Sequence, residues 1–173
     1  MAPDGGLWMF NEFPLVPWET WINLPFEDIV YEILSIVFPE LDIDKDFIHK
    51  AYAQFEQPEI VPSIFRKHQI VELYHGPSAA FKDIALSVLP ELSHRAFIKS
   101  GTRVVPHILT ATSGDTGSAA LMGFKGSVFP ITVFYPQVGI SSIQRRQMTT
   151  IDAKGVKVYG IEGNFDDAQA VVK

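Results

Sequence analysis

A lysine that follows a Gly-Pro turn is the first group in this sequence with the character of a catalytic residue. The segment from His75 to Asp83, HGPSAAFKD, follows an apolar run and delivers Lys82 at the start of a predicted helix. The positive end of a helix dipole disfavours the ammonium form and favours the free amine. A free amine is what Schiff-base chemistry requires. Taken alone, however, a lysine after a turn is more often a solvated surface residue.

A second segment has the composition of an anion-binding loop. Residues 110–120, TATSGDTGSAA, follow the apolar run 104–109 and precede a predicted helix. Small and hydroxylated residues at this position leave backbone N–H groups free to converge on a carboxylate or phosphate, and the helix dipole adds to the attraction. An ordinary strand-to-helix turn, capped by Asp115 or Thr116, explains this segment equally well on its own.

Other site chemistries are disfavoured by spacing. Gly114 and Gly117 lack the third glycine of a dinucleotide fingerprint, and no lysine follows them as in a Walker loop. The chain has no cysteine, and its histidines show no metal-ligand spacing, so the sequence predicts neither a disulfide nor a metal site. The histidines are His49, His68, His75, His94 and His107.

The elements that must position these groups alternate from about residue 70 onward. Short apolar or β-branched runs cover 70–74, 104–109, 130–135 and 156–161, and the predicted helices span about 82–98, 116–124, 141–152 and 164 onward. This alternation is typical of βαβ units on a parallel sheet. Ligands in open α/β sheets bind at the carboxyl edge. We therefore expect the last three runs to be neighbouring strands, with loop 111–116 at that edge and within a ligand's length of Lys82.

The first 69 residues form a different region. Residues 1–25 are rich in Pro, Trp and Phe without a regular period, which indicates an extended segment whose tryptophans, Trp8, Trp18 and Trp21, need cover. Apolar residues then recur at helical spacing from Phe26 to Val37, and Asp44 is placed to cap a second helix. The sequence predicts an N-terminal extended and helical segment, 1–69, followed by a partial α/β domain, 70–173.

The last predicted helix has capping signals at its start and none at its end. Asn164 precedes Asp166 and Asp167, which favours a helix start by capping and by charge against the dipole, whereas no capping glycine or return strand follows. We therefore expect the α/β domain to be truncated at its C-terminal end.

The charge distribution limits the partners of the chain. A net charge of −6 disfavours nucleic-acid binding, and no segment has the pattern of a secretion signal or membrane span, so a cytoplasmic location is the default. Residues 1–44 carry nine acidic and no basic side chains. The fourteen basic side chains exceed the eleven remaining acidic ones by three, which suits an anionic small-molecule ligand in the second region.

Taken together, the two chemical segments resemble the threonine synthase family. Residues 72–83, ELYHGPSAAFKD, are similar to its pyridoxal phosphate (PLP) attachment signature, and residues 111–120 are similar to its substrate-anion loop. Further family positions are matched, in order, by residues 2–7, 135–136, 144–148 and 162–167. Ser78 stands where the family pattern has Thr, which preserves the hydroxyl.

The resemblance implies a fold-type II PLP enzyme, of the tryptophan synthase beta-like kind, that converts O-phospho-L-homoserine and water into L-threonine and phosphate. Lys82 would hold PLP and then act as the base at the substrate α and β carbons. The substrate carboxylate would bind to loop donors. These are Thr112, Ser113, Gly114 and Thr116. Asp115 would lie close to the cofactor ring oxygen, and Asp83 would help to position the cofactor.

The resemblance covers only the N-terminal part of the family sequence. The family's glycine-rich loop for the PLP phosphate and its partner for the pyridine nitrogen belong to a later part, so we expect this chain to hold half of a site, to need the remaining part and to be inactive alone. Two alternatives stay open: another fold-type II enzyme, such as a serine or threonine dehydratase, and a non-catalytic truncated relative. The His75-Gly76-Pro77 lead-in argues against the first, and an intact Lys82 argues against the second.

Overall fold

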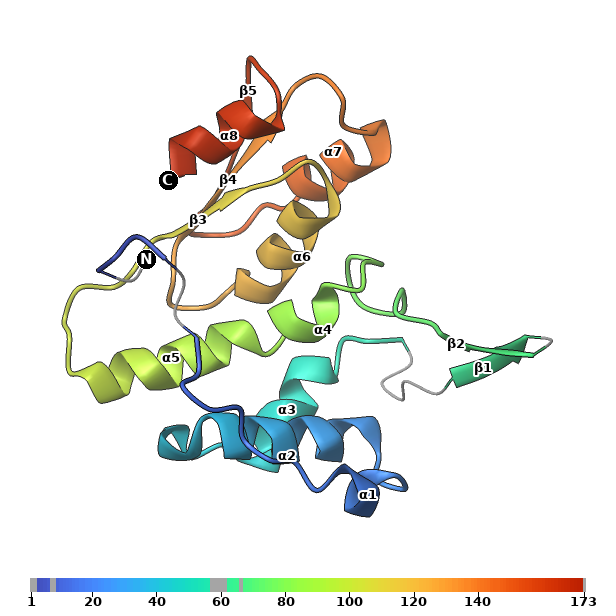
Figure 1. Ribbon diagram of the computed structural model, residues 1–173. Coiled ribbons are helices and arrows are strands. Elements are labelled where there is room, and N and C mark those ends of the chain that lie inside the picture. The colour runs from blue at the N-terminus through green and yellow to red at the C-terminus, as the bar shows by residue number, and fades with distance from the viewer. Residues whose placement is uncertain (1–2, 7–8, 57–61, 66, 173) are drawn as a thin grey trace.

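The computed structural model describes residues 3–6, 9–56, 62–65 and 67–172. Figure 1 shows a layer of N-terminal helices, a middle layer of two helices in line, and a small sheet flanked by helices. A hairpin extends to one side. Of the described helices, none is long and apolar enough to cross a membrane.

The N-terminal layer contains α1 (Trp18–Trp21), α2 (Phe26–Val37), the 3₁₀ turn η1 (Pro39–Leu41) and α3 (Lys45–Tyr52). The predicted helices at 26–37 and after Asp44 are confirmed, and the Asp44 side chain accepts a hydrogen bond from Phe47 N at 2.8 Å. The predicted extended segment is interrupted by the single turn of α1, which the sequence analysis did not predict.

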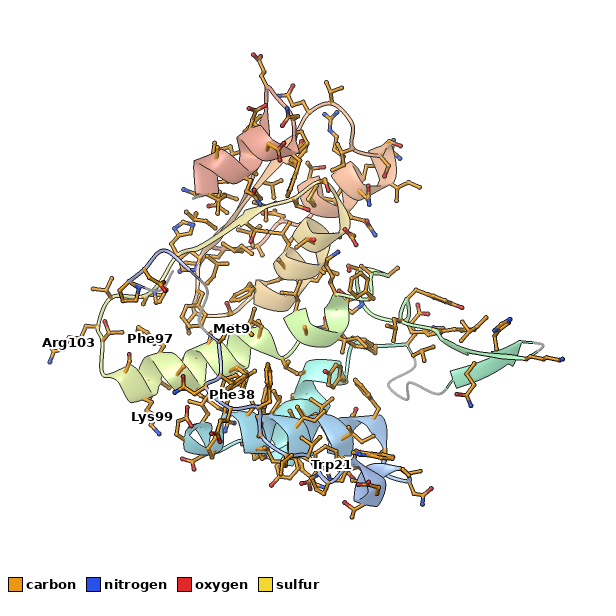
Figure 2. The ribbon with its side chains drawn as sticks, in the orientation of Figure 1. Met9, Trp21, Phe38, Phe97, Lys99 and Arg103 are labelled. Carbon is orange, nitrogen blue, oxygen red and sulfur yellow. The ribbon has the colours of Figure 1, made fainter. Side chains whose placement is uncertain are left out.

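The three tryptophans of the N-terminal segment differ in cover. Trp21 is 7% exposed, whereas Trp18 is 59% exposed, so the expectation of cover holds for Trp21 and is wrong for Trp18 in this structure. Figure 2 shows Trp21 among the side chains of the helical layer. Trp8 lies outside the described residues.

The sheet contains three parallel strands in the order β3 (Ile108–Ala111), β4 (Ile131–Pro136) and β5 (Val156–Ile161). Helices α6 (Asp115–Phe124) and α7 (Ser142–Thr149) lie on one face, and α8 (Phe165–Val172) lies on the other (Figure 1). The predicted parallel neighbours and the predicted α/β class are confirmed. Asn164 Oδ1 accepts from Asp166 N at 2.7 Å, as expected for the cap of α8.

Two predicted strand positions are corrected by the structure. The strand predicted at 104–109 begins instead at Ile108, because Pro106 has no N–H to donate and Val104 is 77% exposed. The strand predicted at 70–74 does not join the parallel sheet. Instead β2 (His68–Val71) pairs with β1 (Pro62–Phe65) in a separate antiparallel hairpin. All residues of β2 are exposed, whereas a parallel strand requires cover on both faces.

The helix predicted at 82–98 is two helices, α4 (Asp83–Leu86) and α5 (Leu89–Ser100). Pro90, in the first turn of α5, has no N–H to donate to the Leu86 carbonyl, which explains the break. That carbonyl faces Gly123 of α6 so closely that a β-carbon at Gly123 would lie 2.1 Å from Leu86 O. A glycine at this crossing lets α6 approach the backbone of α4.

Two apolar clusters stabilise this arrangement. One lies between the sheet and the helices around it, and the other contains α3 side chains together with Val88 and Leu92, so it joins residues on both sides of position 69. Figure 2 shows Phe97 on the side of α5 that faces the sheet layer and Lys99 on the side that faces the N-terminal helices. There Lys99 Nζ donates to Glu40 O at 2.6 Å.

Candidate functional site

The two segments with predicted chemistry meet at one contact. Lys82 immediately precedes α4, Asp115 is the first residue of α6, and Lys82 Nζ lies 2.9 Å from Asp115 Oδ2. The hydrogen bond from Lys82, with its charge, holds the pKa of the Asp115 carboxyl below its usual value. The sequence argument for a free amine considered the helix dipole alone, whereas the structure adds this carboxylate partner.

The turn before Lys82 is built around the buried carboxylate of Asp83. Asp83 is 1% exposed, and its two oxygens accept from Ser78 N at 2.8 Å and from Ser78 Oγ at 2.6 Å. A β-carbon at Gly76 would lie 2.5 Å from Asp83 Oδ2. The chain therefore requires glycine at position 76, and Asp83 is turned into the fold, where it holds the shape of the turn.

Within the same turn, Ala79 has a φ of 57°, in the left-handed region that a β-carbon disfavours. The hydrogen bond from Ala79 N to Gly76 O, at 3.0 Å, accompanies this conformation. The backbone between Gly76 and Lys82 is therefore set by several local constraints rather than by helix propensity.

The predicted anion loop lies at the carboxyl edge of the sheet, directly after β3. Thr112 is buried, and its Oγ1 accepts from both Gly114 N and Gly117 N at 3.0 Å. Thr112 thus shapes the loop from inside. Ser113 is exposed, and Asp115 and Thr116 are half-buried, so these side chains lie at the surface of the loop.

An apolar cavity of about 440 Å³ adjoins the contact between the two segments. Lys82 and Thr116 line it together with Leu73, Phe81, Ile84, Ala85 and Leu86. Lys82 Nζ also lies 4.6 Å from the centroid of the Phe81 ring, within the range of a cation–π contact. The site therefore combines an amine, a carboxylate and apolar walls.

Sequence reasoning missed two residues that support the lysine turn. Gln147 of α7 donates from Nε2 to Ser78 O at 3.1 Å, and Tyr52 of α3 donates to Ile84 O at 2.8 Å. The regular spacing of Gln144, Gln147 and Met148 on one helical face was a signal for the first. Tyr52 carried a weaker signal, because apolar spacing marks a buried tyrosine but not its hydrogen-bond partner.

Other polar side chains face solvent or make contacts of their own. Arg145 and Arg146 of α7 are both exposed. Among the residues that the structure describes, no three His, Asp or Glu side chains gather as metal ligands would. His75 contacts Glu72 at 3.2 Å, and His107 contacts Thr132 at 2.8 Å.

Comparison with known proteins gives the family. No family model matches the chain. Threonine synthase from Pseudomonas aeruginosa is 37% identical over 182 residues, which cover 100% of this chain and 38% of the relative. The crystal structure of threonine synthase from yeast superposes with a TM-score of 0.79 at 33% identity and covers 99% of this chain and 38% of that one. This chain is homologous to the N-terminal part of threonine synthases.

Other threonine synthases agree with this assignment. A structure of PLP-bound threonine synthase from Brucella melitensis gives a TM-score of 0.80 at 31% identity, over 98% of this chain and 38% of that one. Threonine synthase-like 2 from Rattus norvegicus is 36% identical, over 99% of this chain and 37% of the relative. The predicted family and the fold-type II class are confirmed, and the chain spans a little over a third of the length of these relatives.

Proposed function

We propose that this chain provides the lysine-bearing part of a PLP site that converts O-phospho-L-homoserine and water into L-threonine and phosphate. The observation that carries the proposal is the 2.9 Å contact between Lys82 Nζ and Asp115 Oδ2, because it joins the lysine turn to the anion loop. Homology to threonine synthases supports this reaction rather than that of a dehydratase. In this proposal the enzyme is a carbon–oxygen lyase acting on a phosphorylated amino acid.

The residues around Lys82 fit the aldehyde end of PLP. Lys82 is 30% exposed, so its amine is accessible to a small molecule, and Leu73 and Ile84 offer apolar surface for a flat ring. Asp115 provides a carboxylate beside the amine. Lys82 would therefore hold the cofactor, Asp115 would lie near its ring oxygen, and Asp83 would act on the cofactor by holding the lysine turn.

When bound, PLP supplies an electron sink for the negative charge that develops at the substrate α carbon. Lys82 would remove the proton from that carbon and act as a general acid and base at the β carbon. Ser113 and Thr116 would bind the substrate carboxylate through their hydroxyls. Gly114, predicted from the family resemblance to bind it as well, would instead shape the loop, because its N–H donates to Thr112 Oγ1.

The proposal includes the partners of the chain. Relatives extend well beyond the matched part, and we assign the contacts to the cofactor phosphate and ring nitrogen to that further part. The cytoplasm is the proposed location, with a small phosphorylated amino acid as substrate and without a nucleic acid or membrane partner.

The proposal is tested by determining which lysine of this chain PLP modifies. The purified chain is incubated with PLP and reduced with borohydride, and the modified lysines are mapped by peptide mass spectrometry. We expect Lys82 to carry most of the label, although Lys45, for example, is more exposed at 53%. Lys82→Arg should abolish the preferred site, whereas Lys125→Arg, which changes an exposed lysine elsewhere, should keep it. A label distributed according to exposure would overturn the proposal.

A further inference from the structure

One face of α7 contacts both parts of the candidate site. Gln144, Gln147 and Met148 are spaced i, i+3 and i+4, which places them on the same side of a helix. Gln144 and Gln147 are half-buried and Met148 is fully buried, whereas Arg145 and Arg146 are exposed. The buried side of α7 therefore presents two carboxamides and a thioether to the elements around Lys82.

The first contact from this face is made to the lysine turn. Gln147 Nε2 donates to Ser78 O at 3.1 Å, while Ser78 N donates to Asp83 Oδ2 at 2.8 Å. The peptide groups on both sides of the Ser78 α carbon are therefore fixed, one by the turn itself and the other by α7. Lys82 follows only four residues later, so the position of Ser78 limits where its amine can lie.

The other contacts from this face are made to the anion loop. A β-carbon at Gly114 would lie 2.5 Å from Gln144 Nε2, and one at Gly117 would lie 2.5 Å from Met148 Sδ, so both side chains pack directly against glycine backbone. Ser141 Oγ donates to Gln144 Oε1 at 3.0 Å, which orients this carboxamide. The loop and the turn are thus held by the same rigid element.

We propose that Gln147 is a positioning residue, which fixes the lysine turn in register with the anion loop so that Lys82 meets Asp115. The choice of PLP as the ligand rests on the proposed function. The positioning contacts do not depend on it, because they lie within the chain. Loss of the Gln147 hydrogen bond releases one side of Ser78, and the separation of Lys82 from Asp115 is then no longer set by α7.

The experiment compares Gln147→Met with Gln137→Met in the 173-residue chain. Methionine preserves length and helix propensity but cannot donate to a carbonyl. Gln137 is a matched control because its Nε2 also donates to a backbone carbonyl, Gly160 O at 3.4 Å, away from the site. The readouts are the pKa of Asp115, from carbon-detected NMR of its carboxyl, and the fraction of Lys82 that PLP and borohydride modify.

In Gln147→Met we expect the pKa of Asp115 to rise toward its ordinary value of 3.8, because Lys82 no longer donates to it consistently. We also expect Lys82 modification to fall roughly fivefold, the size of effect that one hydrogen bond typically gives. Gln137→Met should change neither quantity. A folded Gln147→Met chain with unchanged Asp115 titration would overturn the positioning role.

A second variant keeps the test decisive if Gln147→Met does not fold. Gln147→Leu carries no charge and cannot donate to Ser78 O at any pH, so the same rise in the pKa of Asp115 is expected. If neither variant folded, the hydrogen bond would be a requirement of the whole fold, and a role confined to the site would be wrong. The two proposals can fail separately. If PLP did not label Lys82 in the chain without substitutions, while the pKa of Asp115 still rose in the Gln147 variants, the proposed function would be contradicted and the positioning role would stand.

Discussion

Lys82 Nζ donates to Asp115 Oδ2 at 2.9 Å across 33 residues of sequence. The side chains are 30% and 43% exposed, so water and salt screen the pair, and its free energy is about 0.2–1 kcal/mol by comparison with other exposed ion pairs. The pair is therefore too weak to hold two helices together. Its significance lies in where the surrounding packing places an amine and a carboxylate.

Replacing Lys82 by methionine should change the pH dependence of stability. The pKa of Asp115 is lowered in the folded chain, so the pair stabilises the fold above the unfolded value of about 3.8, and this contribution is lost as pH falls through the folded pKa. Urea unfolding at pH 6 should show a loss of at most about 1 kcal/mol for Lys82→Met. The two chains should converge as pH falls through the folded pKa of Asp115, and an equal difference above and below that pKa would contradict the ion pair.

Gly123→Ala should destabilise the chain by about 1–3 kcal/mol, as overpacking of a close contact typically does. The added β-carbon would lie 2.1 Å from Leu86 O, a backbone atom that cannot rotate away, and α4 would be displaced from α6. Gly6→Ala is the control, since its β-carbon would meet the exposed Asp4 side chain at 3.1 Å. Urea unfolding of both variants measures the difference, and equal midpoints would show that the crossing adapts without cost.

Tyr52→Phe should lower the free energy of unfolding by about 1–2 kcal/mol, because Ile84 O, in a partly buried position, loses the donor that the buried Tyr52 provides. Burial also raises the pKa of Tyr52, so its hydroxyl stays protonated and able to donate throughout the ordinary pH range. Tyr74→Phe removes an exposed hydroxyl that donates to Glu72, and it should cost much less. Similar losses for the two variants in thermal unfolding would argue against a special role for the Tyr52 contact.

The 173-residue chain should not release phosphate from O-phospho-L-homoserine faster than its Lys82→Ala variant. By family resemblance, the contacts to the cofactor phosphate and ring nitrogen belong to a later part of these enzymes, and each missing charge-assisted contact costs about 1.5–3 kcal/mol. Phosphate release with excess PLP is the measurement. Release well above the Lys82→Ala background would show that this part of the site is sufficient.

The order of the elements could be read from the sequence, because apolar periodicity and caps are local signals. Asp44 and Asn164 were identified as caps from residue type and position, and both accept the expected backbone hydrogen bonds. The position of the loop around Asp115 followed from the rule that ligands collect at the carboxyl edge of a parallel sheet, whereas the run before Lys82 is not a strand of that sheet.

Contacts between distant side chains could not be predicted in the same way. The break at Pro90 was missed because helical spacing continues through it, and the hairpin at β2 was missed because a short apolar run does not reveal its partner strand. Asp83 was assigned to the cofactor by its proximity to Lys82 in sequence, whereas its direction into the turn depends on Ser78. The carbonyl that accepts from Gln147 Nε2 belongs to Ser78, which is 69 residues away in sequence.

The 69 residues between Ser78 and Gln147 also determine which of the two is synthesised first. During synthesis the lysine turn leaves the ribosome well before α7 exists, so the turn must wait for its partner, and Lys82 is a solvated amine until then. Closing this loop costs about 0.6 kcal/mol more than closing the 33-residue loop between Lys82 and Asp115, because each doubling of length adds about that amount of entropy. The hydrogen bond between Gln147 and Ser78 can therefore form only after α7 has been synthesised.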